Sequence, residues 1–156
     1  MRIKFRDIIT EMARRDPRVI LIIGDIGGGL FLAFRKELPK QFFNIGICEQ
    51  SMIGFAAGLA LSGLRPVVFT ITPFLIERAY EQIKVDIHLQ CAPVGLVGYS
   101  DDTEGPTHKP LDAAHILRPM SNIQKMFPYT AAGIPEYFGR VDLNRPWFLN
   151  LTKEPA

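Results

Sequence analysis

The stretch FFNIGICEQSMIGFAAGLALSGLRPVVF, from Phe42 to Phe69, sets one carboxyl group among the fewest polar neighbours in the chain. A short apolar run leads to Glu49, and a helical pattern then runs from about Ser51 to Leu61 and ends at Gly63. Glu49 is therefore expected at the junction between a strand and a helix. An ionisable group in apolar surroundings is a candidate for chemistry.

The predicted helix is unusually rich in small residues, at Gly54, Ala57, Gly58 and Ala60. Each glycine inside a helix costs on the order of 1 kcal/mol relative to alanine, but small side chains let another backbone approach closely. Such a helix belongs in a core or at a subunit interface. Its apolar run of about ten residues is too short for a bilayer, which needs roughly 20.

Length and composition predict one globular domain over residues 1–156, because 47% of the residues are hydrophobic and 22% are charged. The formal charge of +2 and the lack of a long basic run give no sign of a nucleic-acid partner. Cys48 and Cys91 cannot form a disulfide framework, and the first residues lack the apolar core of a signal peptide. A cytoplasmic protein without a membrane partner is expected.

Strand and helix patterns alternate along the chain. Asp16-Pro17 ends a first amphipathic helix, and the run from Val19 to Gly24 has the β-branched composition of a strand buried on both faces. Further strands are expected at Val67–Thr72, Val94–Tyr99 and Trp147–Thr152, and further helical patterns at Leu30–Leu38, around Ile76–Ile87 and, loosely, at Met126–Arg140. This order predicts an α/β fold, a doubly wound and mainly parallel sheet of about five strands with helices on both faces.

The glycine cluster GDIGGG follows the first strand, at residues 24–29. It is not G-x-G-x-x-G and no P-loop lysine follows, so it predicts neither a dinucleotide site nor a P-loop. The plain interpretation is a tight turn that places Asp25 at the end of the strand. His88 and His115 lack metal-ligand spacing, and no zinc site is predicted.

Phe74 and Arg78 stand at the start of the long helical pattern, directly after the third strand. Thr72 is expected to cap this helix, with Pro73 at its first position. The carboxyl ends of parallel strands are where α/β proteins bind ligands, which makes Phe74 a candidate contact. An aromatic residue at this place is nevertheless more often part of the core.

The loop SDDTEGPTHK, residues 100–109, gathers polar and turn residues at the end of the fourth strand. Function concentrates on such loops. Gly105-Pro106 fixes the backbone beside His108 and can hold the imidazole toward a ligand at the strand ends. A lone histidine in a loop is more often a surface residue without a role, so both interpretations stay open on this pattern.

Three strings together resemble a known family: NIGICEQSMIGFAAGLALSGLRPVVF, ERAYEQIKVDI and GPTHKPLD. They are similar to the pyrimidine-binding domain of the transketolase family of thiamine-diphosphate enzymes. The resemblance is greatest to the split members, in which this domain is a separate short chain, and it covers about residues 15–123 well. It implies thiamine diphosphate as cofactor and a subunit of an enzyme that transfers a ketol unit between sugars or sugar phosphates.

The resemblance also implies roles at the cofactor. Glu49 matches the glutamate that holds the aminopyrimidine ring and drives its tautomerisation. Asp25 matches an aspartate near the pyrimidine end of the cofactor. Phe74 matches an aromatic residue that stacks on the pyrimidine, and Arg78, at the spacing found in the split members, is expected to bind the cofactor with it.

On the substrate side the resemblance is less complete. His108 matches a histidine that contacts sugar oxygens, and Glu104 stands where an aspartate is usual. Ile71 stands where many relatives have a second phenylalanine, and a further upstream histidine has no counterpart. The donor or acceptor can therefore differ from those of transketolase itself.

The motif that binds Mg²⁺ and the diphosphate in this family, GDG followed by Asn-Asn, has no match, since Ile26 replaces its second glycine. The resemblance therefore implies that the Mg²⁺ ligands lie on a partner subunit, within a heterotetramer that also contains a contact between two copies of this chain. Three alternatives stay open: a β-type subunit of a 2-oxo-acid dehydrogenase, a deoxyxylulose-phosphate-synthase-like enzyme, and a non-catalytic scaffold that keeps the fold.

Overall fold

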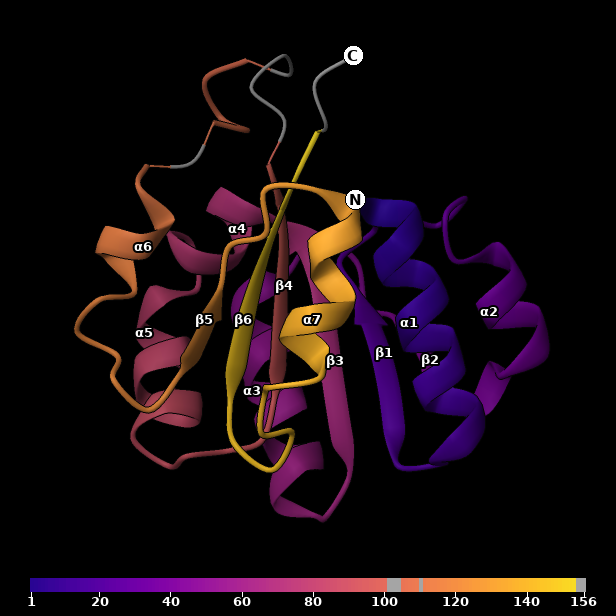
Figure 1. Cartoon of the computed structure of the whole chain (residues 1–156). Coiled ribbons are helices and arrows are strands. Elements are labelled where there is room, and N and C mark those ends of the chain that lie inside the picture. The colour runs from indigo at the N-terminus through magenta and orange to yellow at the C-terminus, as the bar shows by residue number, and fades with distance from the viewer. Residues whose placement is uncertain (101–104, 110, 154–156) are drawn as a thin grey trace.

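A computed structural model describes residues 1–100, 105–109 and 111–153 (Figure 1). Its centre is a six-stranded, all-parallel sheet with the order β2-β1-β3-β4-β6-β5. The strands are β1 Val19–Ile23, β2 Phe42–Asn44, β3 Arg65–Ile71, β4 Gly95–Ser100, β5 Gln124–Met126 and β6 Trp147–Thr152. The α-helices are α1 Arg2–Arg15, α2 Leu32–Glu37, α3 Glu49–Leu61, α4 Thr72–Ile76, α5 Tyr80–Gln82, α6 Ala113–Ile116 and α7 Ile134–Phe138.

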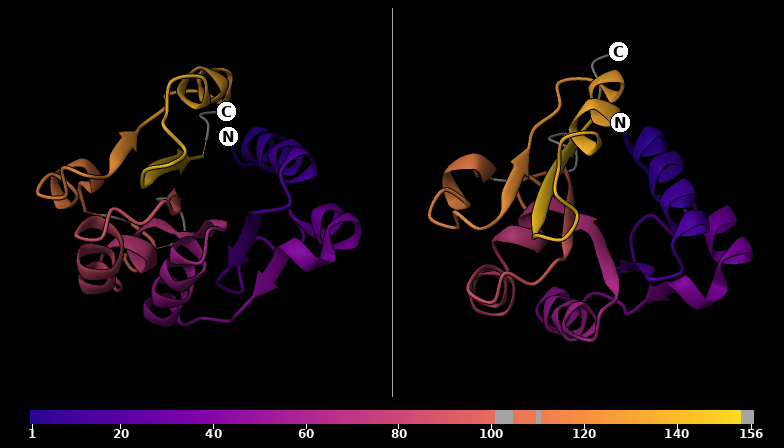
Figure 2. Two further views of the ribbon diagram at one scale, coloured as in Figure 1. Left: turned by 90° about the horizontal axis from the view of Figure 1, so that it is seen from below. Right: turned by 60° about the horizontal axis from the view of Figure 1, so that its bottom comes forward.

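The sheet separates two apolar cores, as β1 illustrates. All five of its residues are buried, and alternate side chains point to opposite faces. Leu21 and Ile23 join the core under α1, α2 and α7, whereas Ile20 and Ile22 join the core under α3, α4 and α6. The views in Figure 2 show these helix layers on either side of the sheet. The predicted doubly wound α/β fold is confirmed.

The strand order indicates where a ligand-binding crevice lies, at the carboxyl ends of the strands. From β1 the chain moves outward to β2, and it then returns to the other side of β1 to form β3. Ligands in open α/β sheets bind where the winding direction reverses, beyond the carboxyl ends of the strands. In this chain that point lies between Gly24, after β1, and Ile71, at the end of β3.

The sheet has one more strand than the sequence predicts. The additional strand is β5, Gln124–Met126, a three-residue edge strand paired in parallel with β6. Gln124 and Lys125 are only partly buried, so this strand lacks the apolar run that marks the others. Of the loosely amphipathic stretch Met126–Arg140, only Ile134–Phe138 forms an α-helix.

The long helix expected after β3 is interrupted. It divides into α4, α5 and a π-helical segment at Ile83–His88, and Arg78 lies in the gap between α4 and α5. Thr72 is not the N-cap but the first helical residue, and no side chain caps this helix. Its hydroxyl is used elsewhere: Thr72 Oγ1 donates to Asn150 Oδ1 at 2.9 Å and accepts from Ser100 Oγ at 2.9 Å.

Helix α3 has two apolar sides. Met52 and Ile53 are fully buried in the core, while Phe55 and Leu61 are 39% and 63% exposed on the outward side. Gly58, which is exposed there, has nothing within 4 Å of the position that a Cβ would take. The helix thus presents a second, uncovered apolar face. None of the helices in the described ranges is long and apolar enough to cross a membrane.

Candidate active site

A cleft of about 220 Å³ lies at the crevice between the ends of β1 and β3. Four parts of the chain contribute to it: the turn after β1, the segment from β2 to the start of α3, the end of β3 with the start of α4, and the loop after β4. Its lining residues are Gly24, Asp25, Ile26, Ile47, Glu49, Thr70, Ile71, Phe74 and His108. The lining is mostly apolar, with one buried carboxylate.

Glu49 is the buried acid of this cleft, with 1% of the residue exposed. It is the first residue of α3, where the positive end of the helix dipole favours a negative charge. Thr70 Oγ1 donates to its Oε1 at 3.2 Å, and Arg78 Nη1 donates to its Oε2 at 2.7 Å. Each carboxylate oxygen therefore has a donor, which a buried charge requires.

Gly24 lies beside the Glu49 carboxylate and has no side chain that could fill the space next to it. A Cβ at this position would lie 3.3 Å from Thr70 Oγ1 and 3.6 Å from Glu49 Oε1. A side chain larger than hydrogen would therefore begin to fill the space next to the acid. Glu49 and Gly24 both line the cleft.

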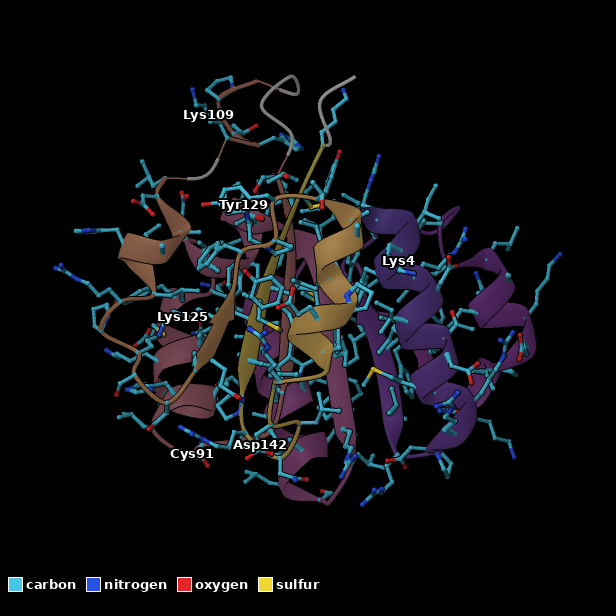
Figure 3. All side chains as sticks on the ribbon, in the orientation of Figure 1. Lys4, Cys91, Lys109, Lys125, Tyr129 and Asp142 are labelled. Atoms are coloured by element: carbon cyan, nitrogen blue, oxygen red, sulfur yellow. The ribbon has the colours of Figure 1, made fainter. Side chains whose placement is uncertain are left out.

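Phe74 forms the aromatic wall. The guanidinium carbon of Arg78 lies 4.1 Å from the centroid of its ring, and the His108 ring meets it edge-on at 5.0 Å and 69°. His108 is partly buried and its Nδ1 lies 3.0 Å from Thr107 Oγ1. The loop that carries His108, marked by Lys109 in Figure 3, stands beyond the carboxyl ends of the strands.

Asp25 occupies the turn after β1 in a left-handed conformation, with φ of 56°. Asn44, the last residue of β2, stabilises this turn: its Oδ1 accepts from the Asp25 backbone N–H at 3.0 Å, and its Nδ2 donates to Asp25 Oδ1 at 3.2 Å. The tight turn expected from GDIGGG is confirmed. It fixes a carboxylate at the rim of the cleft.

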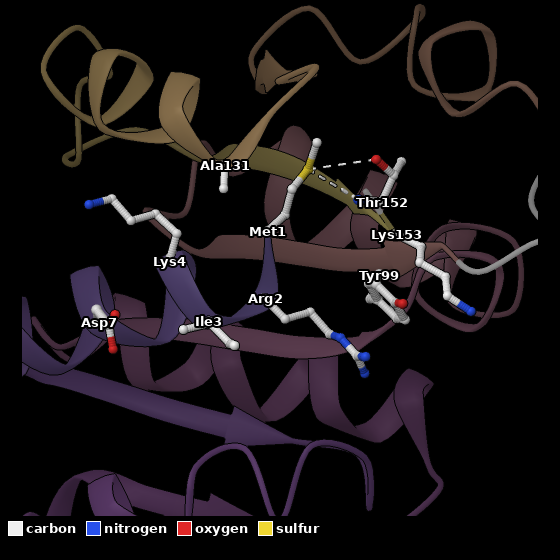
Figure 4. Close-up of a pocket in the computed structure, with 9 residues that line it drawn as sticks. All are labelled: Met1, Arg2, Ile3, Lys4, Asp7, Tyr99, Ala131, Thr152 and Lys153. Atoms are coloured by element: carbon white, nitrogen blue, oxygen red, sulfur yellow. Dashed lines mark hydrogen bonds between the residues drawn. The ribbon is translucent and has the colours of Figure 1, made fainter. Parts of the chain in front are cut away.

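A second hollow, of about 360 Å³, lies at the start of α1 beside the ends of β4 and β6 (Figure 4). Its lining carries more cationic than anionic side chains, since Arg2, Lys4 and Lys153 accompany Asp7. The Arg2 guanidinium carbon lies 4.1 Å from the centroid of the Tyr99 ring. This hollow suits an anionic group better than a cationic one.

Comparison with known proteins identifies the family. The family described as "Transketolase, pyrimidine binding domain" matches residues 1–153. The chain belongs to this family. Among curated relatives, the 1-deoxy-D-xylulose-5-phosphate synthase of Syntrophus aciditrophicus is 41% identical over 132 residues, which are 80% of this chain and 20% of that protein. That of Natranaerobius thermophilus is 38% identical over 151 residues, 91% of this chain and 23% of that protein.

A solved structure gives the same result for the fold of this transketolase-family domain. It is described as "Split gene transketolase, inactive beta4 tetramer" and matches with a TM-score of 0.85 at 25% identity. The match covers 99% of this chain and 51% of that one. The chain also spans only about a fifth of the length of the curated relatives it matches.

Four of the residues singled out in the sequence line one cleft in this pyrimidine-binding domain: Asp25, Glu49, Phe74 and His108. Arg78 joins them through its contacts with Glu49 and Phe74. Glu104 lies outside the described residues. Within the described ranges, no group of three His, Cys, Asp or Glu side chains is placed to hold a metal ion.

Sequence reasoning missed Thr70 and Asn44, which orient the two carboxylates of the site. A signal for Thr70 was present, because it is a hydroxyl residue within the buried strand β3. A polar side chain in such a strand needs a partner. Asn44 gives no such signal, since its role depends on the pairing of β2 with β1.

Proposed function

We propose that this chain is the pyrimidine-side subunit of a split, transketolase-like enzyme that uses thiamine diphosphate to transfer a ketol unit between sugars or sugar-like substrates. The observation that carries the proposal is the buried Glu49 carboxylate in a cleft walled by Phe74 and His108. The family match and the likeness to a split transketolase support it. We further propose that residues 1–156 act as one domain and that the enzyme is cytoplasmic.

The cleft fits the aminopyrimidine end of that cofactor. The space that Gly24 leaves beside Glu49 suits a flat ring, and Phe74 offers an aromatic face next to it. When bound, thiamine diphosphate supplies the carbanion chemistry that sugars and amino-acid side chains cannot supply themselves. This chain contributes binding, orientation and proton handling.

Each residue has a separate task in this proposal. Glu49 holds a proton between its carboxylate and the ring nitrogen of the cofactor, while Thr70 fixes the orientation of Oε1. Phe74 would stack on the ring and Asp25 would lie near its pyrimidine end, while Arg78 contacts both Glu49 and Phe74 on that side. His108 and Glu104 bind hydroxyl groups of the sugar.

The proposal includes a second subunit. A diphosphate is bound in this family through Mg²⁺, which needs several oxygen ligands in near-octahedral geometry. We propose that the partner chain supplies them, and that the outward face of α3 packs against the same face of a second copy within a heterotetramer.

A second candidate function is favoured by the curated relatives. Those reported above are named 1-deoxy-D-xylulose-5-phosphate synthases and are about 40% identical to this chain, whereas the split transketolase is 25% identical. Product analysis of the assembled enzyme separates the two candidates. Formation of 1-deoxy-D-xylulose-5-phosphate would favour the second one, and transfer of a ketol unit between sugars the first.

The test of the cofactor role is substitution of Glu49 in the assembled enzyme. Glu49→Gln and Glu49→Ala should lower cofactor-dependent turnover by about 10²- to 10⁴-fold, the usual contribution of an acid–base group, with a circular-dichroism spectrum like that of the wild type. Glu136→Ala is the matched control, since Glu136 lies on α7, exposed and paired with Arg140. Near-normal turnover of Glu49→Ala would remove Glu49 from the mechanism.

A further inference from the structure

Arg78 makes the two contacts that the proposed function assigns to the cofactor ring. Its Nη1 donates to Glu49 Oε2 at 2.7 Å, and its guanidinium carbon lies 4.1 Å from the centroid of the Phe74 ring. The Arg78 side chain is 40% exposed while that of Glu49 is 1% exposed. The arginine therefore covers the buried acid from the solvent side.

A guanidinium and an aminopyrimidine share the chemistry of this position. Both are flat and both stack on an aromatic face, and each can share a proton with the Glu49 carboxyl group: the guanidinium donates an N–H, and the ring nitrogen accepts from protonated Glu49 or donates once it is itself protonated. Thr70 donates to Oε1 of Glu49, and Arg78 donates to Oε2 from the solvent side, from which a ring would approach. A ring cannot take Oε2 and the Phe74 face while Arg78 holds both.

We propose that Arg78 is a placeholder: it caps Glu49 when the pyrimidine site is empty and moves outward when the aminopyrimidine binds. The inference rests on the proposed function and adds a competition to it. A buried carboxylate without a partner is costly, so the placeholder keeps Glu49 paired until the ring arrives. Arg78 thus positions Glu49 while the pyrimidine site is empty, and it leaves this position when the ring binds.

The backbone around Arg78 suits such a movement. Arg78 lies in the gap between α4 and α5, and its N–H bonds to Pro73 O at 3.2 Å. The following residue, Ala79, is fully buried and anchors the chain. The guanidinium can therefore swing into solvent by side-chain rotation while the backbone stays in place.

The test is an NMR titration of the chain with the free aminopyrimidine half of thiamine, followed through the amide signals of Gly24 and Thr70. Arg78→Ala should bind this compound about three- to tenfold more tightly than the wild type, as expected when a competing contact of cation–π strength is lost. Arg118→Ala removes the same charge from an exposed arginine near α6 and should match the wild type. Adding Glu49→Gln to Arg78→Ala should abolish the gain.

The possible outcomes separate the roles of Arg78. Weaker binding by Arg78→Ala would make Arg78 a direct ligand of the ring, and unchanged binding would make it a bystander; either result overturns the placeholder. If none of the chains binds the compound even at tens of millimolar, the placeholder is wrong, whereas the proposed cofactor is judged separately by the Glu49 substitutions in the assembled enzyme. Should Arg78→Ala fail to fold, Arg78→Lys keeps the cation but loses the flat contact, and it must still bind more tightly than the wild type.

Discussion

Glu49 is an acidic residue in apolar surroundings. The residue begins an apolar helix and is 1% exposed, yet it has donors on both carboxylate oxygens. These donors come from β3 and from the gap after α4, about 20 and 30 residues along the chain. Removing one partner of such a buried charge is expected to cost more than removing an exposed charge.

His108 is the residue whose role can be separated from that of the cofactor. His108→Ala should raise the KM for the sugar about three- to tenfold, the loss of one hydrogen bond to a substrate hydroxyl, with little change in cofactor affinity. Steady-state kinetics and a thiamine diphosphate titration on the assembled enzyme measure the two effects. His115→Ala, on the exposed side of α6, is the control.

The opposite pattern would contradict this role. If His108→Ala lost most of its cofactor affinity while its dependence on sugar concentration stayed unchanged, the edge-on contact of His108 with Phe74 would be its function.

At the scale of elements, Gly98 lets α4 sit directly on β4. A Cβ on Gly98 would lie 2.5 Å from Thr72 Oγ1 and 3.0 Å from Thr72 Cα, which is backbone and cannot turn away. Gly98→Ala should therefore push α4 off the sheet and disturb the Thr72–Ser100–Asn150 hydrogen bonds. We expect a loss of about 1–3 kcal/mol in the free energy of unfolding, measured with urea.

Gly58→Ala is the control for that substitution, because nothing lies within 4 Å of its Cβ position. It should stabilise the isolated chain by up to about 1 kcal/mol, since alanine favours a helix. Equal stabilities of Gly98→Ala and the wild type would show that α4 does not rest on β4 as described.

A second prediction at this scale concerns the end of α1. Asp16 accepts hydrogen bonds from Arg18 and lies 3.4 Å from Arg65 Nη1 at the start of β3. The hydrogen bonds from Arg18, more than the charge of Arg65, lower the pKa of Asp16 below its ordinary 3.8. A lowered pKa contributes stability above the unfolded-state value, and this stability is lost as the pH falls through the folded-state value.

Asp16→Asn should therefore lower the free energy of unfolding by about 0.5–1 kcal/mol at neutral pH, and the difference from the wild type should shrink below about pH 4. Urea unfolding at several pH values measures it. Asp7→Asn, which changes an exposed pair with Arg6, is the control. A deficit in Asp16→Asn that stays constant down to about pH 3 would assign it to the changed hydrogen bonds with Arg18 and not to the charge.

The elements also differ in how well the sequence predicts them. Strands β1, β3, β4 and β6 are apolar runs between turn residues, and their patterns predict them to within one or two residues. Strand β5 and the break after α4 have no such local pattern. Strand β5 depends on its pairing with β6, and the break after α4 depends on the packing of α4 against β4. The site follows the same rule: motifs point to Asp25, Glu49, Phe74 and His108, but Thr70 and the contacts of Arg78 with Glu49 and Phe74 are seen only in the fold.

At the scale of the whole molecule, the parallel sheet brings residues from distant segments together at the carboxyl ends of its strands. In the proposed function these residues surround only one end of the cofactor. Glu49, Phe74 and His108 line one cleft, and in the proposed function Glu49 and Phe74 contact the pyrimidine ring and His108 a sugar hydroxyl. The chain spans about a fifth of the curated relatives and half of the split transketolase structure it matches. The likeness to a split transketolase supports the proposal that a second polypeptide completes the active site.

The chain alone is therefore expected to be inactive and to bind thiamine diphosphate weakly even with Mg²⁺. In the chain alone, only the pyrimidine ring of the cofactor would be bound. The contacts of Mg²⁺ and the partner with the diphosphate, which dominate the binding of so anionic a group, would be missing. Calorimetry of the purified chain should give little or no heat at micromolar concentrations, and addition of the partner subunit should restore tight, Mg²⁺-dependent binding together with ketol transfer. The Glu49→Ala chain mixed with the same partner controls for assembly without chemistry. Tight metal-dependent binding and turnover by this polypeptide on its own would overturn the two-subunit proposal.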